Sequence, residues 1–403
     1  MAGRQVLAQL GKADIILSGQ PDITFFLEQY KPQGLFATRV VNVQFEREPT
    51  YGTDSFVTLP MNGDLMTAMY ARFDISTTTG TAFYDSAGTL MIDRVELYIG
   101  NQLIERLWGE FITLVNEVEV PQGQQVGLTN LIGGNSLGAT NTPLSRYVVP
   151  LRFKALERGL PVVPNMQFRI ILNNFSDFCS NPALTFPMTF NLLAEYVFLG
   201  ESERAYIQKR GPTVHLAENV QRARYLVPAG TSNVRCMTNF LHPVKELFVT
   251  VQNQNATGFD YWLDSSNIAG PSYSNNFSNI NQLNSMAIYF NEAQRLDPLI
   301  GTNLLLGTAQ FIENHTRVPT RPFYMYSFSL DPESSRPSGA VNFGRLKHQY
   351  FDLYLARQNP DLAQNRIVTI WARYYQFLEV DGFKTMRVLF DNMNETGQSS
   401  FIP

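Results

Sequence analysis

The chain has 403 residues, of which 44% are hydrophobic and 16% are charged, and its formal net charge is −4. A single hydrophobic core stops growing at roughly 250–300 residues, so this length predicts two domains. The slight acidic excess and the lack of a basic run argue against binding of the whole chain to nucleic acid. The sequence contains no stretch of about 18 consecutive apolar residues, so no membrane-spanning helix is predicted.

The charged fraction is low, because soluble domains average about 25% charged residues. Two explanations remain open. One is that much of the surface is used in subunit contacts, where charged residues are depleted. The other is that the surface is polar because it is rich in Asn, Gln, Ser and Thr. Cys179 and Cys236 are too few for a disulfide framework and lie in different predicted domains, so we expect free thiols in a reducing compartment. The first ten residues are of mixed polarity and do not resemble a secretory signal.

The segment 1–17 is weakly amphipathic, with only Arg4 and Lys12 as basic residues. A membrane-binding helix would show a wider apolar face with several basic residues opposite it. We therefore interpret this segment as an arm that packs under its own subunit. The alternative is an arm that contacts a membrane or other proteins.

The first half of the chain contains clear strand signals of period two. One is the segment 69–75, in which four apolar residues fall on one face: Met69, Ala71, Phe73 and Ile75. The segment 94–99 repeats this alternation. Such faces, bounded by Gly, Pro, Asn and Ser, predict all-β sandwiches. Between the strands, the spacing of Leu107, Phe111 and Leu114 suggests a helical turn within 107–120, with a surface insertion as the alternative.

The segment 121–141 is long and polar, so we expect an exposed loop there. Glu201 to Arg210 begins with acidic residues and ends with Lys209-Arg210 before Gly211-Pro212. This order of charges favours a short helix near the domain junction. We place the boundary between the two domains within residues 200–222.

The second half repeats the rhythm of strands and polar loops. Strands are predicted where Leu247, Val249 and Val251 alternate with other residues, and again at 367–374. The asparagine- and serine-rich segment 253–284 predicts a second exposed loop. Further on, 323–330 alternates as a strand, Pro337-Ser338-Gly339 has the composition of a turn, and alternation resumes at Val341 and Phe343.

Chemical motifs are missing from the sequence. The four histidines are scattered without metal-like spacing: His215, His242, His315 and His348. No nucleophile elbow, paired-histidine helix or phosphate-binding loop occurs. We therefore expect no catalytic, cofactor-binding or metal site, and no cofactor.

Five sequons occur, at Asn174, Asn255, Asn276, Asn314 and Asn394. Several such matches arise by chance in an asparagine-rich chain. Asn255 and Asn276, within the predicted loop 253–284, are the two possible glycosylation sites.

Two motifs resemble those of one protein family. Tyr324 to Leu330, followed by Arg336-Pro337-Ser338-Gly339 and Asn342-Phe343, resembles the signature of major capsid proteins from nucleocytoplasmic large DNA viruses, of the phycodnavirus and iridovirus type. Near the amino terminus, Pro21, Ile23, Phe25 and Phe26 belong to an opening block, Asp14 to Phe26, that is similar to the same family. Weaker matches follow in the same order along nearly the whole chain. The chain is short for the family, and its tail lacks the expected glycine-rich ending.

The resemblance implies a double jelly roll: two tandem eight-stranded jelly-roll sandwiches with short helices in loops. Residues 1–24 would form an amino-terminal arm, 25–210 the first jelly roll, and 211–403 the second jelly roll with its tail. The signature residues would then be structural, and the two polar loops would form the outward-facing towers.

The implied function is that of a major capsid protein, made in the host cytoplasm and found in the virion. Three copies would form a homotrimer whose pseudo-hexagonal outline tiles an icosahedral shell. Its partners would be neighbouring capsomers, minor capsid and penton proteins, and an internal membrane or minor proteins contacted by the amino-terminal arm. No direct nucleic-acid binding is expected.

Two alternatives stay open at this point. A scaffold or minor capsid protein of the same fold would look the same in sequence. A carbohydrate-binding or hydrolysing jelly-roll protein belongs to a different functional class. It would need an aromatic platform or a carboxylate pair, and a secretion signal.

Overall fold

The computed structural model describes residues 2–9, 11–20, 26, 32–76, 83–84, 86–133, 144–179, 186–254, 282–358 and 360–389. The chain divides into two compact units, Met1–Leu35 and Phe36–Pro403. The smaller unit contains helices α1 (Ala2–Ala8) and α2 (Lys12–Ser18). Ile16 and Leu17 on α2 are each 86% exposed. None of the helices in the described part of the chain is long and apolar enough to cross a bilayer.

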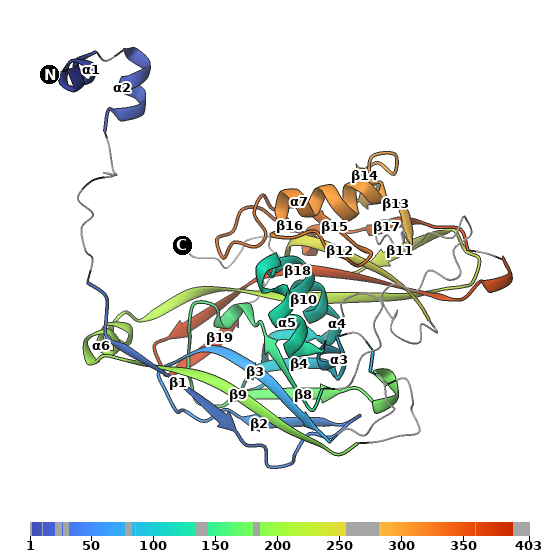
Figure 1. Cartoon of the computed structure of the whole chain (residues 1–403), viewed down its shortest axis with the longest axis horizontal. Coiled ribbons are helices and arrows are strands. Elements are labelled where there is room, and N and C mark those ends of the chain that lie inside the picture. The colour runs from blue at the N-terminus through green and yellow to red at the C-terminus, as the bar shows by residue number, and fades with distance from the viewer. Residues whose placement is uncertain are drawn as a thin grey trace. The chain divides into compact units, whose positions relative to one another are not determined.

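The first sandwich is built from two antiparallel sheets (Figure 1). One sheet has the order β1-β9-β3-β6, with β7 paired to β3, and the other has the order β2-β8-β4-β5. The strands are β1 (Phe36–Val43), β2 (Asp54–Thr58), β3 (Leu65–Ile75), β4 (Ile92–Ile99), β5 (Gln102–Trp108), β6 (Arg146–Leu151), β7 (Leu160–Pro161), β8 (Met166–Leu172) and β9 (Met188–Leu199).

The second sandwich has the same construction. Its sheets have the orders β10-β18-β12-β15 and β11-β17-β13-β14, while β16 pairs with β12 and β19 pairs with β18. The strands are β10 (Pro212–Val227), β11 (Asn233–Thr238), β12 (Pro243–Asn253), β13 (Leu283–Phe290), β14 (Ala293–Leu296), β15 (Phe323–Ser327), β16 (Val341–Asn342), β17 (Gln349–Leu355), β18 (Arg366–Asp381) and β19 (Thr385–Leu389).

Both sandwiches have the same topology. When the eight principal strands of each half are counted in chain order, one sheet reads 1-8-3-6 and the other 2-7-4-5 in both halves. This pairing of outer and inner strands is a jelly roll, made from two Greek keys. The prediction of two tandem eight-stranded jelly rolls is confirmed, and the repeat is visible in the strand order.

The strands form where side chains alternate between an apolar and a polar face. In β3, Met69, Ala71 and Phe73 are buried in the first core, while Tyr70 and Arg72 are only half-buried. The strands β12 and β18 differ, because both of their faces are buried. Val249 and its neighbours on one face of β12 enter the second core, whereas Phe248 and Trp371 join the first. The two sandwiches are therefore fused along these strands.

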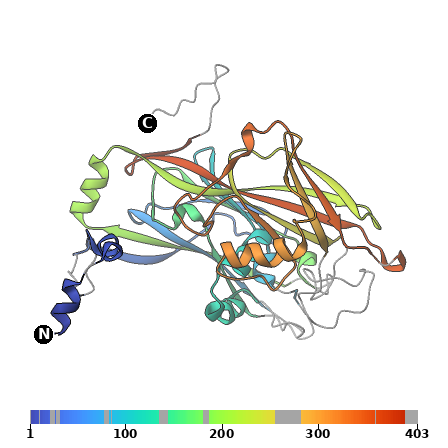
Figure 2. The ribbon, with the colours of Figure 1, turned by 90° about the horizontal axis from the view of Figure 1, so that it is seen from above.

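Helices occupy the connections between strands. The predicted helix after residue 200 is α6 (Glu201–Lys209), which links β9 to β10 and is seen at one end of the ribbon in Figure 2. The remaining short elements are α3 (Ala87–Leu90), α4 (Gly109–Glu119), η1 (Gln122–Gln124), α5 (Gln125–Ile132), η2 (Lys154–Leu156), η3 (Phe175–Asp177), η5 (Leu305–Ala309), α7 (Gln310–Asn314), η6 (Phe343–Arg345) and η7 (Pro360–Leu362). The helical turn suggested within 107–120 is α4, and it is almost wholly buried.

One predicted loop is wrong in part. Residues 122–132 form η1 and α5 rather than a loop, although most of these residues are exposed, as predicted. The reason is the spacing of Leu128 and Ile132, which lie one helical turn apart and are buried, with Gly133 ending the helix at a φ of 74°. Residues 134–141 lie outside the described residues. The same is true of most of the second predicted loop, of which only 253–254 and 282–284 are described.

Candidate functional site: the charged junction and the edge loop

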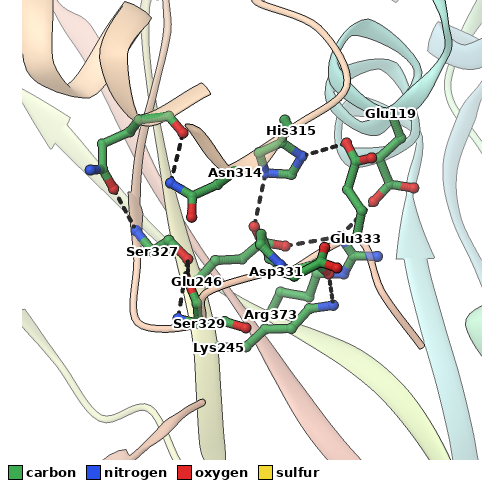
Figure 3. A network of polar contacts seen from close by, with 12 residues as sticks. Glu119, Lys245, Glu246, Asn314, His315, Ser327, Ser329, Asp331, Glu333 and Arg373 are labelled. Carbon is green, nitrogen blue, oxygen red and sulfur yellow. Dashed lines mark hydrogen bonds and ion pairs between the residues drawn. The ribbon is translucent and has the colours of Figure 1, made fainter. Parts of the chain in front are cut away.

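The junction between the sandwiches is formed by α4 and η2 from the first half and by β10, β12 and β18 from the second. Phe111 of α4 packs against Trp371 and Phe248, with ring centres 5.5 and 6.1 Å apart. Beside this aromatic contact lies a set of buried charged side chains (Figure 3). We call this set the charged junction: Glu119, Glu218, Lys245, Glu246, His315 and Arg373.

Arg373 is at the centre of the charged junction and is 2% exposed. Its guanidinium contacts three carboxylates, those of Glu119 at 2.6 Å, Glu218 at 2.8 Å and Glu246 at 2.9 Å. These come from α4, β10 and β12. A single cation on β18 therefore connects an element of the first sandwich to two strands of the second.

The charges in this cluster stabilise one another. Burial by itself would raise the pKa of Glu246, but Arg373 and then His315 lower it to about 2. The pKa of Glu119 is likewise lowered against the effect of burial, first by Arg373 and then by Lys154. Burial opposes the charged form of Arg373, yet the three glutamates raise its pKa. Glu119, Glu246 and Arg373 are therefore ionised at neutral pH.

Lys245 enters the cluster because of a β-bulge. The register between β12 and β18 shifts between Val244 and Glu246, so Lys245 is an extra residue in the strand. Its ammonium group donates to Glu218 at 2.6 Å and to the carbonyl oxygen of Pro332 at 2.5 Å. Lys245 is fully buried. The bulge thus attaches the segment around Pro332 to the charged junction.

His315 follows α7 and has carboxylates at both ring nitrogens. Nε2 lies 3.0 Å from Glu246 and Nδ1 lies 2.9 Å from Glu333. Burial favours the neutral ring, but Glu246 and then Glu333 raise the pKa of His315 to about 9. The imidazolium therefore donates to both carboxylates and joins Glu333 to the charged junction.

A second group of contacts joins α4 to the segment after His315. Arg317 pairs with Glu117 at 3.0 Å, and Arg321 pairs with the same carboxylate at 3.4 Å. The backbone N–H of Arg317 also donates to the carbonyl of Val118. Since Glu117 is 6% exposed, this too is a buried link between the two halves.

The signature segment forms an interruption in an edge strand. β15 pairs with residues 246–250 of β12, and the backbone N–H of Phe328 donates to the Lys245 carbonyl. The chain then leaves the sheet and returns at β16, where Val341 pairs with Val244. β15 and β16 are thus two segments of one interrupted edge strand that pairs with β12. We call the inserted residues 329–340 the edge loop.

Ser338 holds the edge loop together from inside. Its hydroxyl lies 2.5 Å from that of Ser329, accepts from the N–H of Asp331 at 2.9 Å, and is 3.0 Å from the Asp331 carbonyl. Gly339 has a φ of 142°, and a Cβ at this position would lie 2.7 Å from the Phe328 carbonyl oxygen. The turn composition of Pro337-Ser338-Gly339 agrees with this backbone angle, and the motif is a loop within one edge strand.

The other predicted signature residues differ in their surroundings. Phe343 is fully buried in the second core, and the Asn342 side chain accepts from the N–H of Gly344. Arg336 and Pro337 are exposed. Phe26 is 80% exposed. Five residues lie outside the described residues: Pro21, Ile23, Phe25, Asn255 and Asn276.

The arrangement offers structural rather than catalytic chemistry. His242 stacks on Tyr374, His215 is half-buried and His348 is exposed. Across the described ranges, no group of three or more His, Cys, Asp or Glu side chains is arranged to hold a metal ion. Cys179 and Cys236 are both buried, and neither forms a disulfide, as expected. The charges of the junction are paired with one another, so their effect is to fix the sandwiches together.

Sequence reasoning did not identify the charged junction. A signal was present, because Lys245-Glu246 and Arg373 interrupt long apolar strands in a chain with few charges. A charge on a strand is normally read as facing solvent, and these strands have no solvent face. Since Arg373 lies more than 100 residues from Glu119 and from Glu246, its pairing with them was not accessible from the sequence.

Comparison with known proteins gives a consistent result. The family described as "Large eukaryotic DNA virus major capsid protein" matches residues 203–379, and that described as "Major capsid protein N-terminus" matches residues 24–199. A major capsid protein of Pyramimonas orientalis virus is 25% identical over 400 residues, which cover 94% of this chain and 96% of the relative. A major capsid protein of Paramecium bursaria Chlorella virus 1 is 24% identical over 390 residues, covering 87% and 86%.

Solved structures are similar in fold. The crystal structure of PBCV-1 VP54, fitted into a reconstruction of the virophage Sputnik, has a TM-score of 0.77 at 19% identity and covers 92% of this chain and 100% of its own. The Faustovirus major capsid protein has a TM-score of 0.67 at 12% identity, with coverage of 91% and 94%. At these identities the likeness concerns the fold alone.

Proposed function

This chain belongs to the family of large eukaryotic DNA virus major capsid proteins, and we propose that three copies of it associate into a capsomer with a pseudo-hexagonal outline. Members of this family are structural components of the virion capsid rather than enzymes. Homotrimer formation, the tiling of an icosahedral shell and the partners of the capsomer are the proposed part.

The observation that carries the proposal is the repeated jelly roll. Both halves have the same strand order, and the two sandwiches are fused through buried contacts of α4 with β12 and β18. Three such pairs around a three-fold axis place six similar sandwiches in a ring. A nearly six-fold outline can fill a flat face by lateral packing with neighbouring capsomers, while curvature and vertices are left to minor capsid and penton proteins.

The contacts between the two sandwiches explain how one subunit can tile regularly. A capsomer tiles regularly only if the two sandwiches of each subunit keep one angle. The charged junction and the aromatic contact of Phe111 fix that angle with groups that are costly to separate. The signature residues act in the same way. Gly339 and Ser338 shape the edge loop, which reaches the first sandwich where Arg158 donates to Ser335.

We assign residues 1–24 to the arm, 25–210 to the first jelly roll and 211–403 to the second with its tail. The strands of the two sandwiches fall within 36–199 and 212–389, which supports this division. The arm, with the apolar residues Ile15, Ile16 and Leu17 exposed on α2, suits contact with minor proteins or an internal membrane. Asn255 and Asn276 remain the proposed sugar-carrying positions, to be tested by peptide mass spectrometry.

Sedimentation analysis of the purified chain tests the trimer. The expected species is three times 45.6 kDa, formed without added ligand, and its negative-stain images should show a pseudo-hexagonal outline. A chain that stays monomeric at high concentration would contradict the proposal. The copy number of the protein in purified particles separates a major shell component from a scaffold or minor component.

A further inference from the structure

Arg222 has an unusual position at the junction of the two sandwiches. It lies on β10, directly opposite Trp371 on β18. Its guanidinium carbon is 5.0 Å from the ring centre of Trp108 and 5.6 Å from that of Trp371. Trp108 is the last residue of β5 in the first sandwich, and the two tryptophan rings are 5.4 Å apart. The cation therefore stacks on rings from both halves of the chain.

Arg222 forms no direct ion pair with any described residue, although Glu110 and Asp93 are near enough to favour its charged form. Within the described ranges, no hydrogen bond or ion pair reaches its guanidinium, although the side chain is half-buried. The nearby carboxylates are used elsewhere, because Glu110 pairs with Arg224 at 2.8 Å and Asp93 pairs with Arg94 at 3.4 Å. Burial, and then the charge of Arg224, lower the pKa of Arg222. The charged guanidinium is therefore incompletely compensated at this site.

The Arg222 side chain lines a surface pocket of about 400 Å³. Arg106, whose guanidinium pairs with Glu96 at 2.5 Å, also lines it, as do Gln221 and Asn239, and the lining includes no acidic residue. Trp108 and Tyr374 supply apolar walls. A pocket that offers the Arg222 guanidinium, the Asn239 amide and aromatic walls is suited to a small group with negative charge.

A second arginine that stacks on an aromatic ring, Arg235, has a carboxylate partner. Arg235 lies 4.5 Å from the ring centre of Tyr350, and its Nε and Nη2 each donate to the Asp352 carboxylate at 2.7 Å. This is the two-bond arrangement that guanidinium and carboxylate groups prefer. Arg222 has the aromatic support without the carboxylate.

We propose that the pocket beside Arg222 binds a carboxylate group from outside the chain, held by the guanidinium as Asp352 is held by Arg235. The group comes either from a small carboxylic acid or from an acidic side chain of a neighbouring copy. In both cases the carboxylate binds where the two sandwiches meet. This proposal does not depend on the trimer.

The first experiment is a titration with acetate, and with sodium chloride at matched ionic strength as a control. Trp108 and Trp371 are two of the three tryptophans, so a Trp262→Phe background isolates their fluorescence. We expect a saturable change with acetate and none with chloride. Arg222→Gln should weaken the response at least about tenfold, since charge-assisted hydrogen bonds are roughly twice as strong as neutral ones. Arg235→Gln, the matched control, should leave it unchanged.

A second variant keeps the test independent of any folding defect in Arg222→Gln. Asn239→Asp places a carboxylate in the pocket wall and should abolish the acetate response while the melting temperature stays the same or rises. Absence of a saturable response in the parent protein, or an equal response in Arg222→Gln, would overturn the proposal. The source of the carboxylate follows from sedimentation without acetate. Weaker self-association of Arg222→Gln assigns it to a neighbouring copy, and unchanged association assigns it to a small acid.

Discussion

Arg373 of β18 and Glu119 of α4 form a buried ion pair, 2.6 Å long, that joins the second sandwich to the first. Both side chains are removed from water, and Arg373 also balances Glu218 and Glu246. Buried charges of this kind favour one arrangement of the two halves, because separating them leaves several charges without partners.

Substitution of Arg373 by Met should therefore be severe. Three carboxylates would remain close together in a buried site, and loss of one partner of such a cluster costs about 3–5 kcal/mol. This is a large part of the 5–15 kcal/mol typical of a domain. Urea unfolding measures the effect. The matched control is Arg235→Met, which removes an exposed ion pair and should change the midpoint little.

Alkaline pH should loosen the charged junction through His315. Its folded-state pKa of about 9 lies above the ordinary value of 6.5, so its stabilising effect is complete below pH 6.5 and is lost as the pH rises through 9. The shift corresponds to about 3 kcal/mol. Unfolding free energies measured between pH 6 and pH 10 should decrease over this window.

The control for this effect is His315→Gln, compared with the parent at each pH. Burial, and then Arg373, lower the pKa of Lys245, so its own titration affects stability in the opposite direction. Lys245 is present in both proteins, as are Glu246, Glu333, Glu119 and Arg373, so the difference between the two curves isolates the histidine. A difference that does not vary with pH would show that His315 is not charged in the folded protein.

Gly339→Val should destabilise the second sandwich. The residue has a φ of 142°, which valine adopts only with strain, and the new Cβ would lie 2.7 Å from the Phe328 carbonyl. Strain of this kind costs about 1–3 kcal/mol. Thermal melting and the yield of soluble assembled protein measure the effect. Arg336→Ala, in the same loop but exposed, should have little effect. Equal melting of the two variants would remove the structural role assigned to Gly339.

Phe111→Ala should affect the half of the chain to which Phe111 does not belong. The residue is 2% exposed and packs on Trp371 and Phe248 of the second sandwich. Truncating a buried phenylalanine costs about 3–5 kcal/mol. Hydrogen exchange should become faster in β12 and β18 as well as in α4. Tyr206→Ala on the exposed face of α6 is the comparison, and it should leave exchange in β12 and β18 unchanged.

Alternation along single strands made most of the fold predictable. Alternate side chains of a strand share one face, so a strand with one solvent-exposed face buries the apolar set on the other. In β3 this set includes Met69, Ala71 and Phe73. Glu201 and Lys209 predicted α6 through their order, since charge at helix ends is a local effect. The helix α5 was missed because its apolar residues, of which only Leu128 and Ile132 are buried, lie within a longer segment, 121–141, that is polar as a whole.

The charged junction could not be predicted in the same way. Phe248 and Trp371 lie on the strand faces opposite the second core, and those faces are buried because α4, β5 and α7 pack on them. The packing of the two domains decides whether Glu246 faces water or Arg373, and this packing cannot be inferred from the local sequence. The bulge at Lys245 adds one residue to the register and changes which side chains enter the cluster.

The edge loop has a consequence for association between molecules. β15 and β16 form the edge strand of their sheet. An uninterrupted edge strand of that length would expose a row of unpaired backbone N–H and C=O groups that could pair with a strand of another molecule. The insertion of residues 329–340 divides this row into two short pieces. If many copies of the chain pack side by side, as we propose, this division protects them from growing into continuous β-ribbons through this edge. The side-chain surfaces are left to direct how copies meet.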